Sequence, residues 1–223
     1  LAETDFRPDH WTELLPHRDD VMLEAIDVFQ GHWVAWERVM GLVRIRVTDR
    51  STDASQYVEF PEPVYEAYPG PNPEWDTGAL RYHYESPVTP GSVYDYHVGT
   101  GSSALLKRRE VLGGFDPSRY GCERIRVTAA DGISIPVSLV FRRNPSLETP
   151  APALLTGYGG FEISMTPNYN AGVGRAWTSQ GGVYVVANIR GGGEYGPRWH
   201  QAALKANRLR AYEDFAAVAQ DLV

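Results

Sequence analysis

A tyrosine set among glycines is the first group in this sequence that could take part in catalysis. The segment Gly157-Tyr158-Gly159-Gly160-Phe161 follows the short apolar run 153–156. When an enzyme transfers an acyl group, the alkoxide that forms on the attacked carbonyl needs fixed hydrogen-bond donors, and glycines let the backbone come close to it. The phenol of Tyr158 could be such a donor. A single tyrosine considered by itself is better explained as an aromatic side chain packed on a loop.

A second glycine cluster, Arg190-Gly191-Gly192-Gly193-Glu194-Tyr195-Gly196, follows the apolar run 182–189. It formally matches the G-x-G-x-x-G pattern of dinucleotide-binding loops. That pattern also requires an acidic residue at the end of a following strand, about 20 residues on, whereas Asp214 falls in a helical pattern. We therefore interpret Gly191 to Gly193 as a structural loop folded tightly against a sheet. Arg190 and Glu194 are a candidate ion pair that braces this loop.

The other groups of a catalytic triad are missing from the sequence. No G-x-S-x-G motif occurs, so no serine has the strand-to-helix turn that a nucleophile requires. We interpret each histidine as a solvent-facing or packing residue and not as a general base: His10, His17, His32, His83, His97 and His200. None lies among ligand-type neighbours at metal spacing, so we expect no metal and no cofactor.

Both glycine segments follow short apolar runs, which is typical of buried strands in a parallel sheet whose carboxyl-terminal loops form a site. Before them, Asp131-Gly132 lies between alternating apolar residues and predicts a β-hairpin of 123–129 and 133–142. A polar loop is predicted at 144–150. These strands would therefore place the two glycine loops at one edge of a sheet.

Two helices are predicted in this half of the chain. One spans 169–180, although its glycines weaken helix formation. The other spans 210–223, where apolar side chains recur at helical spacing and polar ones fall mostly on the other side. The apolar set is Phe215, Val218, Ala219 and Leu222, and the polar set is Glu213, Asp214, Gln220 and Asp221. Hairpin, strand, helix, strand and helix make an α/β order that stops before a full sheet is built.

Residues 11–110 have a different pattern, with short strands and turns and no helical periodicity. They form two successive sets of four predicted strands, each set about 40 residues long, which is the spacing of β-propeller blades. A β-sandwich from a larger protein would show the same strands. The strands are 21–29, 33–38, 42–48, 56–60, 64–68, 80–85, 93–98 and 104–109, with Thr89-Pro90-Gly91 as one of the turns. Two blades cannot close a ring, so we expect further blades before Leu1.

The turn-rich segment 111–117 is the predicted domain boundary. The fold class is therefore a partial, all-β set of propeller blades in residues 1–110, followed by the N-terminal part of an α/β-hydrolase domain in residues 111–223. The missing initiator methionine indicates that the sequence is an internal piece of a longer chain.

Composition excludes several classes of partner. The formal net charge is -7, and Lys107-Arg108-Arg109 is the only tight basic run, so we expect no nucleic-acid partner. A single cysteine, Cys122, excludes a disulfide framework and suits a reducing compartment. No apolar stretch approaches the roughly 18 residues that span a bilayer, and residues 1–5 lack the features of a signal peptide. We therefore expect a cytoplasmic protein without membrane partners.

Four segments, 157–161, 166–169, 187–196 and 199–200, together closely resemble the prolyl oligopeptidase family of serine peptidases. The resemblance covers essentially the whole chain. The earlier half is more similar to the oligopeptidase B branch, through segments 60–65, 92–96, 106–107 and 110–116, and the later half to prolyl oligopeptidase itself. The resemblance implies a β-propeller that caps an α/β-hydrolase domain, in agreement with the order of elements above.

The resemblance also implies roles for two residues. Tyr158 matches the family's oxyanion-hole tyrosine, and Phe161 matches an aromatic residue that lines the pocket for the residue before the scissile bond. A flat apolar ring suits proline or another apolar side chain, whereas the oligopeptidase B branch accepts Arg or Lys through acidic residues that would lie beyond Val223. Both preferences therefore stay open.

The implied function is the cleavage of short peptides by acyl transfer through serine, histidine and aspartate. In the family these three residues follow the helix at 210–223. We therefore expect the remainder of the chain to be needed for a closed propeller, a complete sheet and activity, and the 223-residue piece to be inactive alone. Two alternatives remain: an esterase or acylaminoacyl-peptidase on the same scaffold, and a propeller that binds partners without catalysis.

Overall fold

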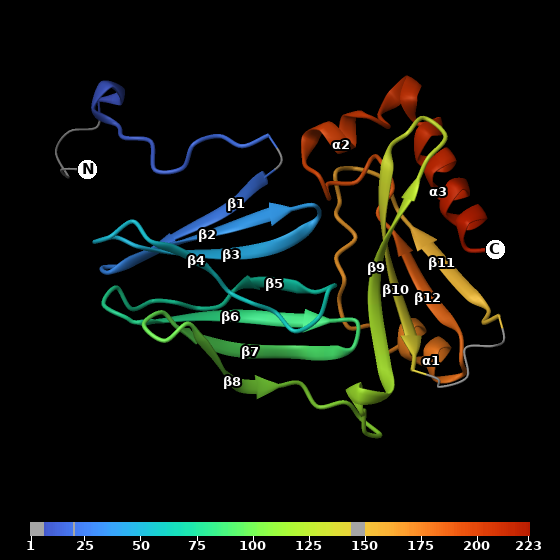
Figure 1. Cartoon of the computed structure of the whole chain (residues 1–223), viewed down its shortest axis with the longest axis horizontal. Helices are drawn as coiled ribbons and strands as arrows, with labels where there is room; N and C mark the ends of the chain where they lie inside the picture. The colour runs from blue at the N-terminus through green and yellow to red at the C-terminus, as the bar shows by residue number, and fades with distance from the viewer. Residues whose placement is uncertain (1–6, 20, 144–149) are drawn as a thin grey trace.

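The computed structural model describes residues 7–19, 21–143 and 150–223, and these residues form three four-stranded sheets (Figure 1). Two sheets lie against each other in the N-terminal half, and the third belongs to the C-terminal half. Residues 1–5, whose sequence lacks the features of a signal peptide, and nearly all of the predicted loop 144–150 lie outside the described residues.

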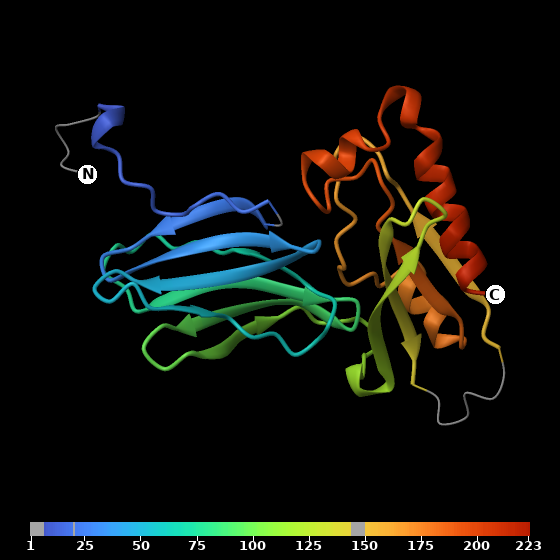
Figure 2. The same ribbon diagram turned by 45° about the horizontal axis from the view of Figure 1, so that its top comes forward.

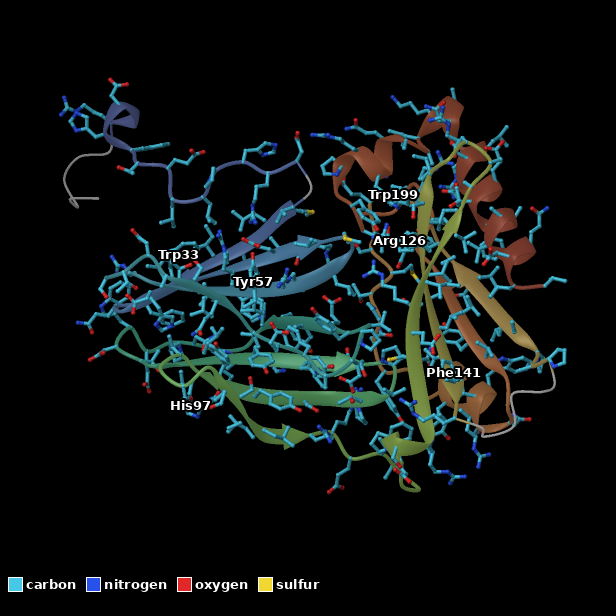
Figure 3. The ribbon with its side chains drawn as sticks, in the orientation of Figure 1. Trp33, Tyr57, His97, Arg126, Phe141 and Trp199 are labelled. Carbon is cyan, nitrogen blue, oxygen red and sulfur yellow. The ribbon has the colours of Figure 1, made fainter. Side chains whose placement is uncertain are left out.

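The first sheet is entirely antiparallel and follows a short 3₁₀ helix, η1 (Pro8–His10). Its strands pair in chain order: β1 (Val21–Val28), β2 (His32–Val39), β3 (Leu42–Asp49) and β4 (Ser55–Tyr57). Trp33 and Tyr57 lie on this sheet (Figure 3), each beneath an arginine guanidinium. The fully buried Glu37 carboxylate accepts a hydrogen bond from Arg18 at 2.5 Å and lies 3.0 Å from Arg46 Nε, so this buried charge is paired.

The second sheet repeats this arrangement. Its strands also pair antiparallel in chain order: β5 (Glu66–Pro69), β6 (Ala79–Ser86), β7 (Thr89–His97) and β8 (Ser102–Arg108). The two sheets pack face to face (Figure 2) over one core that contains Trp36, Ile45, Leu80 and Tyr84. The prediction of two successive four-stranded sets is therefore confirmed.

One predicted turn is wrong. Thr89-Pro90-Gly91 lies within β7, where Thr89 pairs with Ser86. Pro87 and Val88 form the actual turn, which the Ser86 hydroxyl stabilises by accepting a hydrogen bond from the Val88 amide at 3.2 Å. Val88 is buried, so the chain turns on an apolar residue instead of a polar one.

The third sheet is mixed and has the order β11-β12-β10-β9. A short 3₁₀ helix, η2 (Pro117–Arg119), leads into the predicted hairpin of β9 (Tyr120–Thr128) and β10 (Ser134–Arg142). The strands β11 (Ala153–Gly157) and β12 (Val183–Ala187) run parallel, with Gly157 opposite Ala187. The loops that follow these two strands therefore leave the sheet at the same edge.

Helices cover both faces of this sheet. α3 (Leu209–Asp221) packs on the face that carries Val137 and Val185, and α1 (Val173–Ser179) lies on the other face, where Gly174 approaches Tyr184. α1 is shorter than the predicted helix 169–180. Between β12 and α3 lie α2 (Pro197–Gln201) and the 3₁₀ helix η3 (Lys205–Asn207), which were not predicted.

The C-terminal unit contacts both N-terminal sheets. Val64, which precedes β5, and Val88, in the turn between β6 and β7, share a small apolar core with Cys122 and Val140. At the first sheet, Arg124 donates a hydrogen bond to the Met40 carbonyl. Among the residues that the structure describes, none of the helices has the length and apolar character needed to cross a bilayer.

Candidate active site

Tyr158 follows directly after β11, at the edge of the sheet where both parallel strands end. Its side chain is 43% exposed, and its hydroxyl bonds to none of the described residues. The ring folds back over Gly160: a β-carbon there would lie 3.5 Å from Cε1 of the tyrosine and 3.9 Å from its hydroxyl oxygen. The phenol is therefore presented at the surface with its donor free for a ligand.

The chain reverses direction immediately after this tyrosine. Phe161 and Glu162 have φ angles of 51° and 57°, the left-handed region that side chains rarely adopt. The Ile163 amide closes the turn by donating to the Gly160 carbonyl at 3.0 Å. Phe161 is 82% exposed, so an apolar ring projects into solvent beside the tyrosine. Two consecutive residues in this conformation are typical of a segment that its surroundings hold in place for function.

The two glycine loops pack against each other, backbone to backbone. Gly191 has a φ of 100°, and a β-carbon on it would lie 2.3 Å from the Gly159 carbonyl oxygen. A β-carbon on Gly193 would lie 2.2 Å from the Glu162 carbonyl oxygen. Neither distance is possible for a larger residue without a shift of the backbone. This close packing joins the loop after β12 to the tyrosine loop.

The predicted ion pair between Arg190 and Glu194 is wrong. Arg190 points beneath the loop, where its Nη2 and Nε donate to Asp214 at 2.6 and 2.9 Å and its Nη1 donates to Asp131 at 2.6 Å. Hydrogen bonding to Asp214 raises the pKa of Arg190, and the hydrogen bond from Arg190 lowers the pKa of Asp131. Arg190 and Asp214 are buried, although Asp214 was expected on the polar side of its helix.

Glu194 is buried and braces a different segment. Its Oε1 accepts hydrogen bonds from the Met165 amide at 2.9 Å and from Asn188 Nδ2 at 3.2 Å. Its Oε2 has no partner among the described residues and lies against Gly192, where a β-carbon would be only 2.1 Å away. Burial raises the pKa of this carboxyl group. Glu194 therefore ties the loop after β12 to the segment around Met165, which follows the tyrosine loop.

Two further side chains contact the tyrosine loop, and neither was singled out from the sequence as a site residue. Arg208, just before α3, donates to the Gly159 carbonyl. His200 on α2 is half-buried, with Nδ1 2.7 Å from the Gly191 carbonyl oxygen. The short helix α2 was not predicted, so the sequence offered no element from which to place His200.

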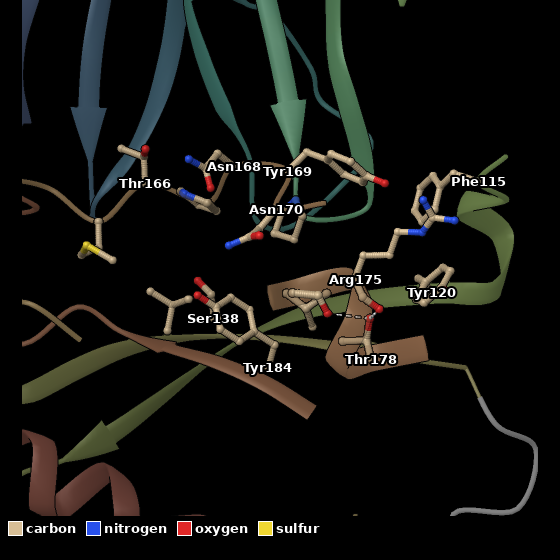
Figure 4. A pocket seen from close by; sticks show the side chains of 16 residues that line it. Phe115, Tyr120, Ser138, Thr166, Asn168, Tyr169, Asn170, Arg175, Thr178 and Tyr184 are labelled. Atoms are coloured by element: carbon tan, nitrogen blue, oxygen red, sulfur yellow. Dashed lines mark hydrogen bonds between the residues drawn. The ribbon is translucent and has the colours of Figure 1, made fainter. Parts of the chain in front are cut away.

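Two cavities formed by described residues lie outside this loop. A small one of about 60 Å³ lies between α1, β10 and segment 165–170 (Figure 4), with Phe115, Tyr120, Tyr169 and Tyr184 in its wall. A larger one of about 660 Å³ separates residues 13–23 from residues 194–198. Neither is lined by Tyr158 or Phe161. In the part of the chain that the structure describes, no three His, Cys, Asp or Glu side chains gather as metal ligands.

Comparisons with known proteins relate both halves of the chain to prolyl oligopeptidases. A family model described as "Prolyl oligopeptidase, N-terminal beta-propeller domain" matches residues 2–109, and another described as "Prolyl oligopeptidase family" matches residues 171–223. Dipeptidyl aminopeptidase BI from Pseudoxanthomonas mexicana is 36% identical over 214 residues, which are 96% of this chain and 29% of that protein. Prolyl endopeptidase from Elizabethkingia meningoseptica is 36% identical over 143 residues, 64% of this chain and 20% of that protein.

A solved structure shows the same arrangement. Oligopeptidase B from Leishmania major superposes with a TM-score of 0.82 at 31% identity, covering 97% of this chain and 32% of that one. The chain thus spans less than a third of the length of each of these relatives.

Proposed function

The chain belongs to the prolyl oligopeptidase family of serine peptidases, and on this premise we propose that it carries the oxyanion-binding tyrosine of an enzyme that cleaves short peptides. The resemblance and the fold class predicted from the sequence are confirmed by these matches. The catalytic role of Tyr158 and the preference for short peptides are our proposal.

One observation carries the proposal: Tyr158 presents a free hydroxyl at the edge where β11 and β12 both end. During attack on a peptide bond, negative charge builds on the carbonyl oxygen, and a hydroxyl already held in place can donate to it without reorganising. The interlocked glycine loops hold the backbone on both sides of this residue. A flexible loop would lose this advantage, because ordering it would oppose stabilisation of the transition state.

Phe161 supplies the neighbouring contact in this proposal. Its exposed ring leaves the same turn as the tyrosine and offers a flat apolar surface to the residue that precedes the scissile bond. Such a ring accommodates proline, another apolar side chain, or the aliphatic stem of Arg or Lys. Relatives named prolyl endopeptidase and oligopeptidase B both match the chain, so substrates of both kinds belong in the test.

The remaining catalytic groups come from outside this sequence in our proposal, since no G-x-S-x-G motif occurs within it. Serine, aspartate and histidine would complete the site, and the 223 residues alone would not hydrolyse peptides. We also propose a cytoplasmic location, which the single cysteine supports: Cys122 is free and buried, as suits a reducing compartment.

The test compares the whole product of the gene with residues 1–223 alone. Both are assayed on blocked Gly-Pro and Arg-Arg reporter peptides, and on a simple ester because the same donor would serve any acyl transfer. We expect the whole product to cleave at least one peptide and to be inactivated by a serine-reactive fluorophosphonate, and residues 1–223 to be inactive. Fluorophosphonate-sensitive turnover by residues 1–223, or none by the whole product on the peptides, would contradict the proposal.

A further inference from the structure

Three polar atoms from three segments meet behind the exposed Phe161. The Glu162 amide nitrogen lies 3.3 Å from the Gly191 carbonyl oxygen and 3.1 Å from Nδ1 of His200. The same Nδ1 lies 2.7 Å from the Gly191 oxygen. This triangle joins the strained turn, the loop after β12 and helix α2.

The distances favour one of the two neutral tautomers of His200. The Gly191 oxygen can only accept, and 2.7 Å is the length of a strong N–H···O hydrogen bond. If Nδ1 carried no proton, its lone pair would face the lone pairs of that oxygen at the same short distance. The shorter contact favours a proton on Nδ1, which then donates to the Gly191 oxygen. The Glu162 amide is within hydrogen-bond distance of both atoms, and with this tautomer it donates to the Gly191 carbonyl and not to Nδ1. In the neutral ring, Nε2 then carries no proton.

Helix α2 is itself fixed to the loop that His200 contacts. The Gly191 amide donates to the Trp199 carbonyl at 3.0 Å, and the Trp199 indole donates to the Ile189 carbonyl at 3.1 Å. His200 therefore extends from an anchored helix, and its ring closes a chain of contacts that runs through Gly191 to Glu162. The residues held at the end of this chain are the ones in the left-handed conformation.

We propose that His200 is a positioning residue: its Nδ1–H group holds the Gly191 carbonyl in place, and through it the strained turn that sets the position of the Tyr158 hydroxyl. This inference rests on the proposed function. A left-handed turn of two non-glycine residues persists only while its surroundings hold it. When the hydrogen bond is lost the turn relaxes, and the hydroxyl moves away from the place where charge develops.

The predicted consequence is kinetic and affects both binding and the transition state. Substrate binding depends on the exposed ring of Phe161, which lies in the strained turn itself, and the tyrosine acts as charge builds on the carbonyl. Losing the His200 hydrogen bond should therefore lower kcat and raise KM together. A purely structural role would lower the amount of folded enzyme and leave the kinetic constants of the folded fraction unchanged.

Two substitutions distinguish the ring nitrogens in the whole gene product. In His200→Asn the side-chain amide reaches the place of Nδ1 and can still donate to Gly191, whereas in His200→Gln the amide reaches the place of Nε2. We expect His200→Gln to lower kcat about tenfold or more and to raise KM by more than about twofold, and His200→Asn to restore most of both losses. Gln201→Ala, an exposed change on the same helix, should match the wild type.

A measurement on the unmodified protein supports the test if a variant does not fold. The ¹⁵N shifts of the His200 ring should report a proton on Nδ1, and a neutral ring protonated on Nε2 would overturn the inference. Equal kcat values for His200→Gln and wild type would also overturn it, while leaving the peptidase proposal intact. Absence of serine-dependent turnover in the wild type would overturn both.

Discussion

Replacing Asp214 by Asn should destabilise the C-terminal unit more than any other change of a single charge in this region. The carboxylate is fully buried and accepts hydrogen bonds from the Arg190 amide at 2.9 Å, from Nε at 2.9 Å and from Nη2 at 2.6 Å. An amide of the same size can accept only on one side and turns an NH₂ group toward the guanidinium. Arg190 would keep only Asp131 as a charged partner.

The size of the effect follows from burial. Removing one member of a buried ion pair costs about 3–5 kcal/mol, because the other charge stays buried without compensation. Asp131 contacts the same guanidinium at 2.6 Å, but its side chain is 44% exposed. Water screens that contact, so Asp131→Asn should cost at most about 1 kcal/mol. The two substitutions therefore form a matched pair, with the same chemical change at two depths.

Urea-induced unfolding followed by far-UV circular dichroism measures both variants. We expect the free energy of unfolding to fall by at least about 3 kcal/mol for Asp214→Asn and by at most about 1 kcal/mol for Asp131→Asn. Added salt should reduce only the second effect, because solvent ions do not reach the buried pair. Equal losses for the two variants, or a loss below about 1 kcal/mol for Asp214→Asn, would refute this reasoning.

Two further predictions concern Gly191 in the loop after β12 and Glu66 in the second sheet. Gly191→Ala should cost at least about 3 kcal/mol, because it adds a clash with the Gly159 carbonyl to the penalty of about 1–2 kcal/mol for a left-handed alanine. Gly132 has a φ of 83° and open space around it, so Gly132→Ala should cost only the penalty for the left-handed conformation. Equal losses of unfolding free energy for the two variants in urea would contradict the close packing of the two glycine loops. Burial raises the pKa of Glu66 from 4.5 to about 7, so the folded protein binds this proton more tightly than the unfolded chain does. The free energy of unfolding should therefore fall as pH rises through this window, and Glu66→Gln should remove that part of the slope; identical pH profiles for variant and wild type would count against it.

Local patterns in the sequence predicted the elements well where neighbours along the chain decide the structure. The hairpin depends on the local turn around Asp131-Gly132, where Gly132 has a φ of 83°, and the two parallel strands are short apolar runs that are followed by glycine-rich loops. The turn at 89–91 was misplaced because Pro90 and Gly91 are common in turns. A strand can also contain proline and glycine. Val88 in the actual turn is buried against Cys122 and Val140, which are distant in the sequence and come close to Val88 only in the folded protein.

The partners of the charged residues could not be predicted in the same way. Arg190 and Glu194 are four residues apart, which suggested a local pair, yet Arg190 contacts Asp214 and Asp131 from distant parts of the chain. The position of Asp214 did contain a signal. It lies three residues after Ala211 and four before Val218, both fully buried, so it shares the apolar side of its helix. An acidic residue in such a stripe indicates a buried partner.

The contacts of His200 could not be predicted from the sequence for another reason. Its contacts depend on α2, a helix of five residues that begins with Pro197 and carries no apolar periodicity long enough to predict. The strain at Phe161 and Glu162 is equally invisible, because nothing about these residue types favours the left-handed region. Both features exist because the two glycine loops are folded against each other.

Substitution of Tyr158 by Phe in the whole gene product tests the central claim most directly, since it removes one hydroxyl and leaves the ring over Gly160. We predict that kcat for a cleaved reporter peptide falls about 10²–10³-fold, as is usual when one oxyanion donor is lost, with KM nearly unchanged. A kcat within about threefold of the wild type, in a variant that unfolds at the same urea concentration, would contradict the account.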